Sequence, residues 1–198
     1  PTDVCYRLRY YKATITLRDN TQGYTVGFQR CCRIASIENV SGNSGTTGAT
    51  YSCEIPGNSK LATAPRNSSP IINPNDAIAI CAGTQFTFDF SAVDPDGTDS
   101  LVYSLCEAYV GGGTEPGECY TCTSPAPTST PPFDFIRYRS GYSGGSPLGP
   151  SVTFNSKTGL LSGLAPRSVG QYVLTACVAE YRNGILINTH RKDIHIAV

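Results

Sequence analysis

Apolar residues recur at every second position over most of this chain, and turn-forming residues interrupt them at short intervals. Side chains of a β-strand point alternately to its two faces, so this alternation indicates strands with one buried face. Helical periodicity is almost absent. We expect strands over residues 5–17, 24–34, 49–55, 77–81, 85–92, 101–106, 151–154, 171–181 and 185–198. The pattern predicts an all-β protein.

The expected strands fall into two groups. Those after residue 70 fit an immunoglobulin-like β-sandwich over residues 71–198, and Asn183-Gly184 predicts a hairpin because both residues tolerate positive φ. A long insert at residues 107–150 interrupts the sandwich, and its proline-rich stretch 123–132 favours polyproline II and cannot join a central ladder. Residues 1–70 have too few strands to close a sandwich, so they predict a smaller β domain. That domain either docks on the sandwich or lacks strands upstream of Pro1; we favour the second alternative.

The charges of the chain are balanced. Lysine and arginine number 15, aspartate and glutamate also number 15, and the formal net charge is +0. This balance argues against a nucleic-acid partner, which would require a basic excess. No apolar run approaches the ~18 residues of a membrane helix, so we expect no membrane insertion.

The cysteine content indicates where the protein works. The chain has 9 cysteines and no methionine. That many cysteines is typical of an oxidising compartment, so an extracellular protein is expected. Without methionine, a chain that begins at Pro1 is expected to be a processed product or an excerpt.

Adjacent cysteines stand at the end of one expected strand. Cys31 and Cys32 should point to opposite faces and therefore need different partners. Cys5 and Cys53, on neighbouring expected strands, are the candidates.

The remaining cysteines lie after residue 80. Cys119 and Cys122 form a lone C-x-x-C in the insert, without the second pair of a zinc site, and predict a local disulfide. Cys81, Cys106 and Cys177 compete for one bridge. A Cys106–Cys177 bond would join two strands of the sandwich.

Catalytic constellations are missing from the sequence. His190 and His195 stand five positions apart in one expected strand, which places them on opposite faces and argues against a shared site. No nucleophile elbow, zinc-protease motif or P-loop occurs. We expect a protein that is not an enzyme.

Two motifs in residues 86–198 resemble the cadherin-like, dystroglycan-type immunoglobulin-fold repeats of surface proteins. The first is SAVDPDGTDSLVYSL at residues 91–105, which carries Thr98 where the family usually has Asp. The second is FNSKTGLLSGLAP at residues 154–166, followed by VGQY at residues 169–172. The resemblance implies a cadherin-like sandwich.

Residues 24–33, 48–56 and 180–184 are similar to large surface proteins of gliding Bacteroidota, the gliding-motility-associated adhesins exported by type IX secretion. This resemblance implies a structural or adhesive segment of a large cell-surface polypeptide. Its partners would be neighbouring domains of the same polypeptide or like subunits. The pattern Asp99-Ser100-Leu101 further implies O-glycosylation of Ser100.

A carbohydrate-binding module of a secreted polysaccharide-processing protein is the alternative. Such a module needs exposed aromatic faces for surface glycans, and a loop tyrosine such as Tyr142 could supply one.

The acidic turn of the first motif predicts a calcium site. Calcium takes six to eight oxygen ligands, and Asp94, Asp96 and Asp99 could provide carboxylates from one loop. Glu180 could join them if the strands pair as in the family, and Asp76 is a further possible donor. A plain type I turn, which favours the same Asp-Pro-Asp-Gly residues, is the competing interpretation.

Overall fold

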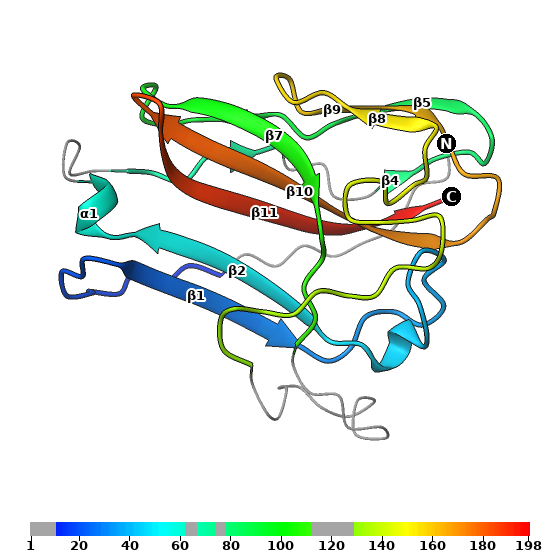
Figure 1. The fold of residues 1–198 in the computed structure, drawn as a ribbon, viewed down its shortest axis with the longest axis horizontal. Coiled ribbons are helices and arrows are strands. Elements are labelled where there is room, and N and C mark those ends of the chain that lie inside the picture. Colours follow the sequence, from blue (N-terminus) through cyan, green and yellow to red (C-terminus); the bar gives the residue numbers. More distant parts are fainter. Residues whose placement is uncertain (1–10, 62–66, 74–77, 112–128) are drawn as a thin grey trace.

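The computed structural model describes residues 11–61, 67–73, 78–111 and 129–198, and these residues are folded almost entirely as β-strands (Figure 1). The strands are β1 (Gly23–Arg30), β2 (Ala49–Pro56), β3 (Ile71–Ile72), β4 (Ile78–Ala79), β5 (Gln85–Asp89), β6 (Ala92–Val93), β7 (Ser100–Cys106), β8 (Val152–Phe154), β9 (Leu160–Leu164), β10 (Gln171–Arg182) and β11 (Ile185–Ala197). A 3₁₀ helix (Ser44–Thr46) and the short helix α1 (Asn58–Leu61) complete the fold. Within this described part, no helix has the length and apolar character needed to cross a membrane.

The all-β prediction is confirmed, with local differences, among them the short strand β3, which was not expected. The described part of the expected first strand, residues 11–17, is not a strand; Tyr11 is 86% exposed and Ile15 is 64% exposed. The apolar side chains of this segment alternate with polar ones, but no other part of the described chain covers them. Strand β9 was not predicted, because its glycine and serine interrupt the apolar pattern.

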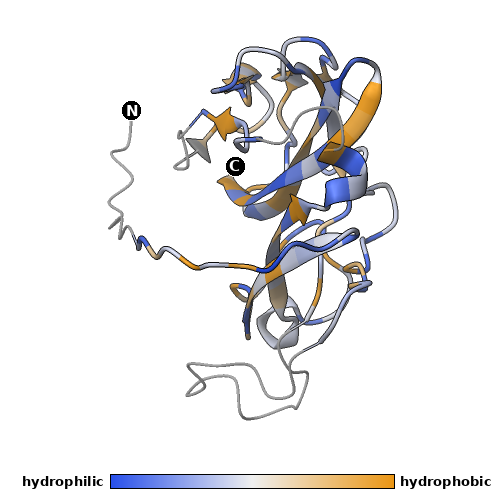
Figure 2. Ribbon diagram, turned by 90° about the vertical axis from the view of Figure 1, so that its left-hand side faces the viewer, coloured by the Kyte–Doolittle hydropathy of each residue, from blue (hydrophilic) through white to orange (hydrophobic). Residues whose placement is uncertain are grey.

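Two sheets pack face to face as a sandwich. One has the strand order β4-β11-β10-β7 and the other β5-β9-β8. Figure 2 shows apolar and polar residues alternating along the strands. The apolar residues meet in a core that consists of Phe90, Leu148, Leu161, Tyr172, Leu174, Ala176, Ile194 and Ile196. The immunoglobulin-like and cadherin-like identity of this sandwich stays a prediction.

The hairpin β10–β11 is the longest pairing in the structure and forms as predicted. Asn183 and Gly184 both have positive φ, 51° and 78°, which the two central positions of a type I′ turn require. The register runs from Arg182 opposite Ile185 to Gln171 opposite Ala197, with a shift between Glu180 and Tyr181.

Strand β10 is buried on both faces, because other segments of the chain pack on the side of the strand that points away from the sandwich core. Its even-numbered residues Tyr172 and Leu174 enter the sandwich core, while Val173 points to the opposite side. There it packs in a second core with Ile37, Val40, Ala108 and Ile136. We call this set the outer core; it joins the segment after β1, the insert and β10.

The hairpin β1–β2 lies beside β11, on the side away from β7 (Figure 1). Asn188 Nδ2 on β11 donates a hydrogen bond of 2.6 Å to the backbone oxygen of Glu54 on β2. The first region therefore packs against the second. The domain boundary near residue 70 and the missing upstream strands stay predictions.

Candidate functional site

The acidic turn after β6 is held by its own backbone. Gly97 N donates to Asp94 O at 3.3 Å, and Gly97 has a φ of 68°, which glycine adopts without strain. The Asp94 carboxylate accepts hydrogen bonds from the backbone N–H groups of Asp96, Thr98 and Asp99 at 2.9, 3.0 and 2.9 Å. The turn is thus present as the sequence predicted.

Arg182, the last residue of β10, fixes this turn to the sheet. Its Nη2 donates to Asp99 Oδ2 at 2.7 Å, and its Nε contacts Asp99 Oδ1. The same Nη2 donates to Asn67 Oδ1 at 2.7 Å and lies 3.7 Å from Asp96 Oδ2. The side chain of Asp99 is 0% exposed and that of Arg182 is 8% exposed, so this ion pair is shielded from water.

Glu180 lies under the same turn, fully buried. Its Oε2 accepts from Asn67 Nδ2 at 3.0 Å and lies 3.2 Å from His190 Nε2, while its Oε1 is buried with no hydrogen-bond partner among the described residues. Carboxylate oxygens of Asp94, Asp99 and Glu180 all lie within 4.8 Å of one another. We call these three residues the acidic group.

The pKa values of the two buried carboxyls in the acidic group, Asp99 and Glu180, are shifted in opposite directions. The hydrogen bonds from Arg182 hold the pKa of Asp99 below its ordinary value. Burial raises the pKa of Glu180, because the ionised form loses its hydration. One carboxyl is thus stabilised as the anion and its neighbour as the neutral acid.

The carboxylates that the structure brings together differ from the expected calcium ligands Asp94, Asp96 and Asp99. Asp96 turns away from the acidic group, and its carboxylate accepts from Ser68 N at 2.6 Å and Ser68 Oγ at 3.0 Å. Glu180 takes its place, as the proposed pairing of the strands allowed. Asp76 lies outside the described residues. The donors are the hard oxygen atoms that calcium prefers, but those of Asp94 and Asp99 already accept hydrogen bonds from the turn and from Arg182, so calcium at the acidic group stays a prediction.

Among the cysteines after residue 80, Cys106 and Cys177 are bonded, with a Cα–Cα distance of 6.0 Å. They lie on the paired strands β7 and β10, as expected for a bond that ties two strands together. Cys81 is exposed and forms no disulfide. Cys119 and Cys122 lie outside the described residues, and their disulfide stays a prediction.

The structure bonds Cys31 to Cys32, a pairing that the sequence did not suggest. Strand β1 ends at Arg30, so the alternation of a strand does not apply to them. Cys53 forms no disulfide, because the register places it opposite Val26, well short of the end of β1. Cys5 lies outside the described residues.

His190 and His195 lie on opposite faces of β11, as predicted. His190 contacts Glu180. His195 lies on the other face, where burial lowers its pKa and the positive charge of Arg33 lowers it further. Arg33 in turn forms a buried ion pair with Asp193, with Nη1–Oδ1 and Nη2–Oδ2 distances of 3.0 and 2.6 Å.

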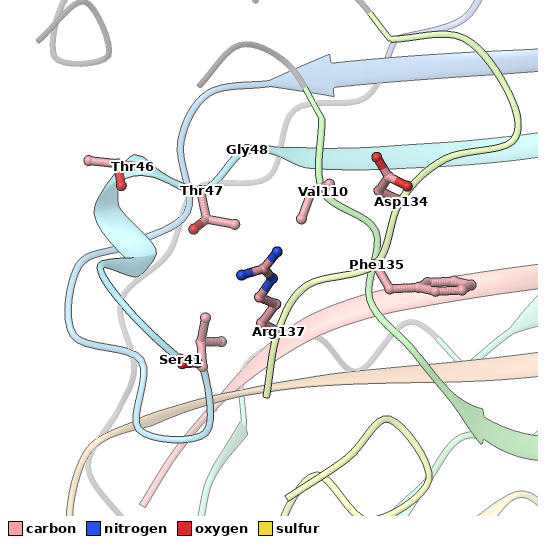
Figure 3. A pocket seen from close by; sticks show the side chains of 9 residues that line it. Ser41, Thr46, Thr47, Gly48, Val110, Asp134, Phe135 and Arg137 are labelled. Atoms are coloured by element: carbon pink, nitrogen blue, oxygen red, sulfur yellow. The ribbon is translucent and has the colours of Figure 1, made fainter. Parts of the chain in front are cut away.

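A pocket of about 620 Å³ opens beside the outer core (Figure 3). One wall is formed by the loop around the 3₁₀ helix and the other by the insert. Its lining residues are Val40, Ser41, Thr46, Thr47, Gly48, Val110, Asp134, Phe135 and Arg137. Sequence reasoning missed this pocket, because its two walls come from segments far apart in the chain that meet only through isolated bridges such as Val40 with Tyr138.

The structure also places Tyr142, the expected sugar-binding tyrosine, and Ser100, the expected glycosylation site. Tyr142 packs edge-to-face on Tyr172, with centroids 6.0 Å apart, and is half-buried, so it offers no open aromatic platform. Ser100 is exposed at the start of β7, and its O-glycosylation stays a prediction.

No family model matches the chain, and no curated protein or solved structure matches it either.

Proposed function

We propose that this chain is a non-catalytic structural or adhesive segment of a large secreted bacterial cell-surface protein. The observation that carries the proposal is the way segments before β10 are fastened to the hairpin β10–β11 by two buried ion pairs and a side-chain hydrogen bond. Arg33 binds Asp193, and Arg182 binds Asp99 and Asn67. Such fastening suits a module that must keep its shape outside the cell.

Covalent bonding supports the same function. The bond between Cys106 and Cys177 closes a sequence separation of 71 residues. A disulfide across so long a loop stabilises a domain by about 2–5 kcal/mol, chiefly by restricting the unfolded chain. The resemblance to gliding-motility adhesins agrees with this function and adds export by type IX secretion.

Calcium is part of this proposal. The acidic group would hold the ion through Asp94, Asp99 and Glu180, and the ion would neutralise carboxylates that Arg182 alone does not balance. Its role would be structural, since it would stiffen the turn against β10.

Binding of surface glycans is the second candidate function. The pocket of about 620 Å³ favours it, because ligand sites in proteins typically measure about 300–1,000 Å³.

Labelling of intact cells tests the primary proposal. Antibodies raised against the chain should label non-permeabilised cells of the source organism, and beads coated with the chain should adhere to like chains or to a surface. Labelling that requires permeabilisation would overturn the proposal. A cytoplasmic protein of the same cells, which must stay unlabelled, is the control.

A further inference from the structure

We propose that the pocket beside the outer core binds a carboxylate-bearing saccharide, with Arg137 pairing with the carboxylate. This inference rests on the second candidate function and deepens it by naming the class of glycan. It does not depend on calcium, because the acidic group contributes none of the lining residues.

The pocket is already formed without a ligand. Ser41 N donates to Arg137 O at 2.7 Å, which ties the loop wall to the insert wall. The insert is also tied to the segment after β7, since Val110 N donates to Asp134 O at 2.9 Å. A Cβ atom on Gly48 would lie 1.4 Å from Gly111 O, so only glycine permits this approach of the chains. A preformed site loses little conformational entropy when it binds.

Arg137 supplies the charge of the site. Figure 3 shows its guanidinium in the middle of the pocket, between Thr47 and Val110. Within the described residues, the guanidinium has no hydrogen bond and no ion pair, whereas the nearby Arg139 donates to Val40 O. A planar guanidinium binds a carboxylate through two parallel hydrogen bonds, so the ligand should carry that group.

Asp134 limits the charge of the ligand. Its carboxylate is a second lining group and also has no hydrogen bond or ion pair with the described residues. A carboxylate beside the pocket repels a dianion such as phosphate more strongly than a monoanion. It accepts hydrogen bonds readily from hydroxyl groups, which a sugar supplies.

The threonines add acceptors of the same kind. Thr46 Oγ1 and Thr47 Oγ1 donate their protons to Asn43 O at 2.9 and 3.2 Å. Their oxygen lone pairs are therefore left to accept hydrogen bonds from a ligand. This arrangement favours a ligand that carries hydroxyl donors in addition to its carboxylate.

An apolar side of the pocket suits the C–H face of a sugar ring. Val110 lines it, and Phe135, which is 53% exposed, lies at its edge with the ring directed away from Arg137 (Figure 3). The ring of Phe135 is stacked on Tyr109, with centroids 5.4 Å apart and planes inclined by 11°, so it is held in place. A fixed aromatic side chain offers contact area at low entropic cost.

Calorimetric titration with defined saccharides tests the proposal. The probes are trigalacturonate as the uronic-acid oligomer, a neutral galactose trimer of the same length, and acetate as the carboxylate alone. We expect trigalacturonate to bind at least about tenfold more tightly than the neutral trimer, since a charge-assisted pair contributes that much. Equal binding of the two trimers, or binding of acetate as tight as that of trigalacturonate, would overturn it.

Arg137→Gln is the decisive variant, because this exposed side chain can be changed without breaking a contact in the described structure. It should weaken trigalacturonate binding about tenfold or more and leave the thermal midpoint unchanged. Arg167→Gln removes one exposed positive charge from the loop before β10 and should bind like the wild type. An equal loss in both variants would show a general charge effect and refute the pocket. Failure of cell-surface labelling with retained saccharide binding would count against the primary proposal alone.

Discussion

The two faces of the hairpin β10–β11 are built by different means. The sandwich face is apolar, with Tyr172, Leu174, Ile194 and Ile196 packed against the opposite sheet. The other face carries Val173, Thr175, Asp193 and His195, and Arg33 covers it. In the described part of the chain, three polar atoms are buried there without a hydrogen-bond partner: Thr175 Oγ1, His195 Nε2 and Arg33 Nε.

The two faces of the hairpin should therefore contribute differently to the free energy of unfolding and to the choice of docking position. Apolar packing is favourable in proportion to the area removed from water and tolerates many sequences of the right volume. A buried ion pair contributes little net free energy, yet the loss of one partner is costly because the other charge remains buried. We infer that the sandwich face supplies most of the stability and that the polar face fixes where the first region docks.

Replacement of Phe90 by alanine should have the largest effect. Phe90 is fully buried in the sandwich core, with its ring 4.7 Å from Phe88 and 5.9 Å from Phe154. The cavity should lower the free energy of unfolding by about 3–5 kcal/mol, as measured by urea denaturation. Val93→Ala, at a site 69% exposed, should change it by less than about 0.5 kcal/mol. Similar losses in both variants would contradict the assigned core.

Arg33→Met tests the polar face. The variant leaves Asp193 buried without its partner, so the free energy of unfolding should fall by about 3 kcal/mol. The double variant Arg33→Met/Asp193→Leu should recover most of that loss, which urea denaturation of both proteins measures. A double variant as unstable as the single one would show that the pair itself, and not the orphaned charge, matters.

Glu180 predicts a pH dependence at the turn end of the same hairpin. Burial raises its pKa above the ordinary 4.5, so the native state binds the proton more tightly than the unfolded chain. The stability that protonated Glu180 contributes is complete below about pH 4.5 and is lost as the pH rises through the folded-state pKa.

Glu180→Gln stays neutral at every pH. With chelator present, its thermal midpoint relative to the wild type should rise by at least about 2 °C between about pH 4.5 and pH 7. Glu54→Gln removes an exposed carboxyl and serves as the control. A difference between Glu180→Gln and wild type that stays constant with pH would refute the buried neutral acid.

Calcium should have the smallest effect. With the affinity of extracellular calcium modules, millimolar calcium should raise the thermal midpoint by about 1–5 °C over the chelated protein. Glu180→Gln should abolish the rise, whereas Asp96→Asn should retain it, because Asp96 lies outside the acidic group. If calcium leaves the thermal midpoint of the wild type unchanged, the protein binds no calcium here and the acidic residues form only the turn that Arg182 holds.

Local chemistry made several elements predictable. The hairpin at Asn183-Gly184 needs positive φ at two adjacent positions, and few residue pairs tolerate that. The Asp-Pro-Asp-Gly turn formed as expected for the same kind of reason. The residues that join Asp94 and Asp99 were harder to identify, because Glu180 and Arg182 come from β10 and reach the turn only through strand pairing.

The sequence by itself determined most of the strands and the tight turns, since period-two alternation and turn propensity act within a few residues. Only the tertiary structure decided the outer core, the Arg33–Asp193 pair and the pocket around Arg137. These features join segments separated by up to 160 positions, as Arg33 and Asp193 are. Contacts over such distances depend on how whole layers pack, and no local pattern of residues encodes that packing.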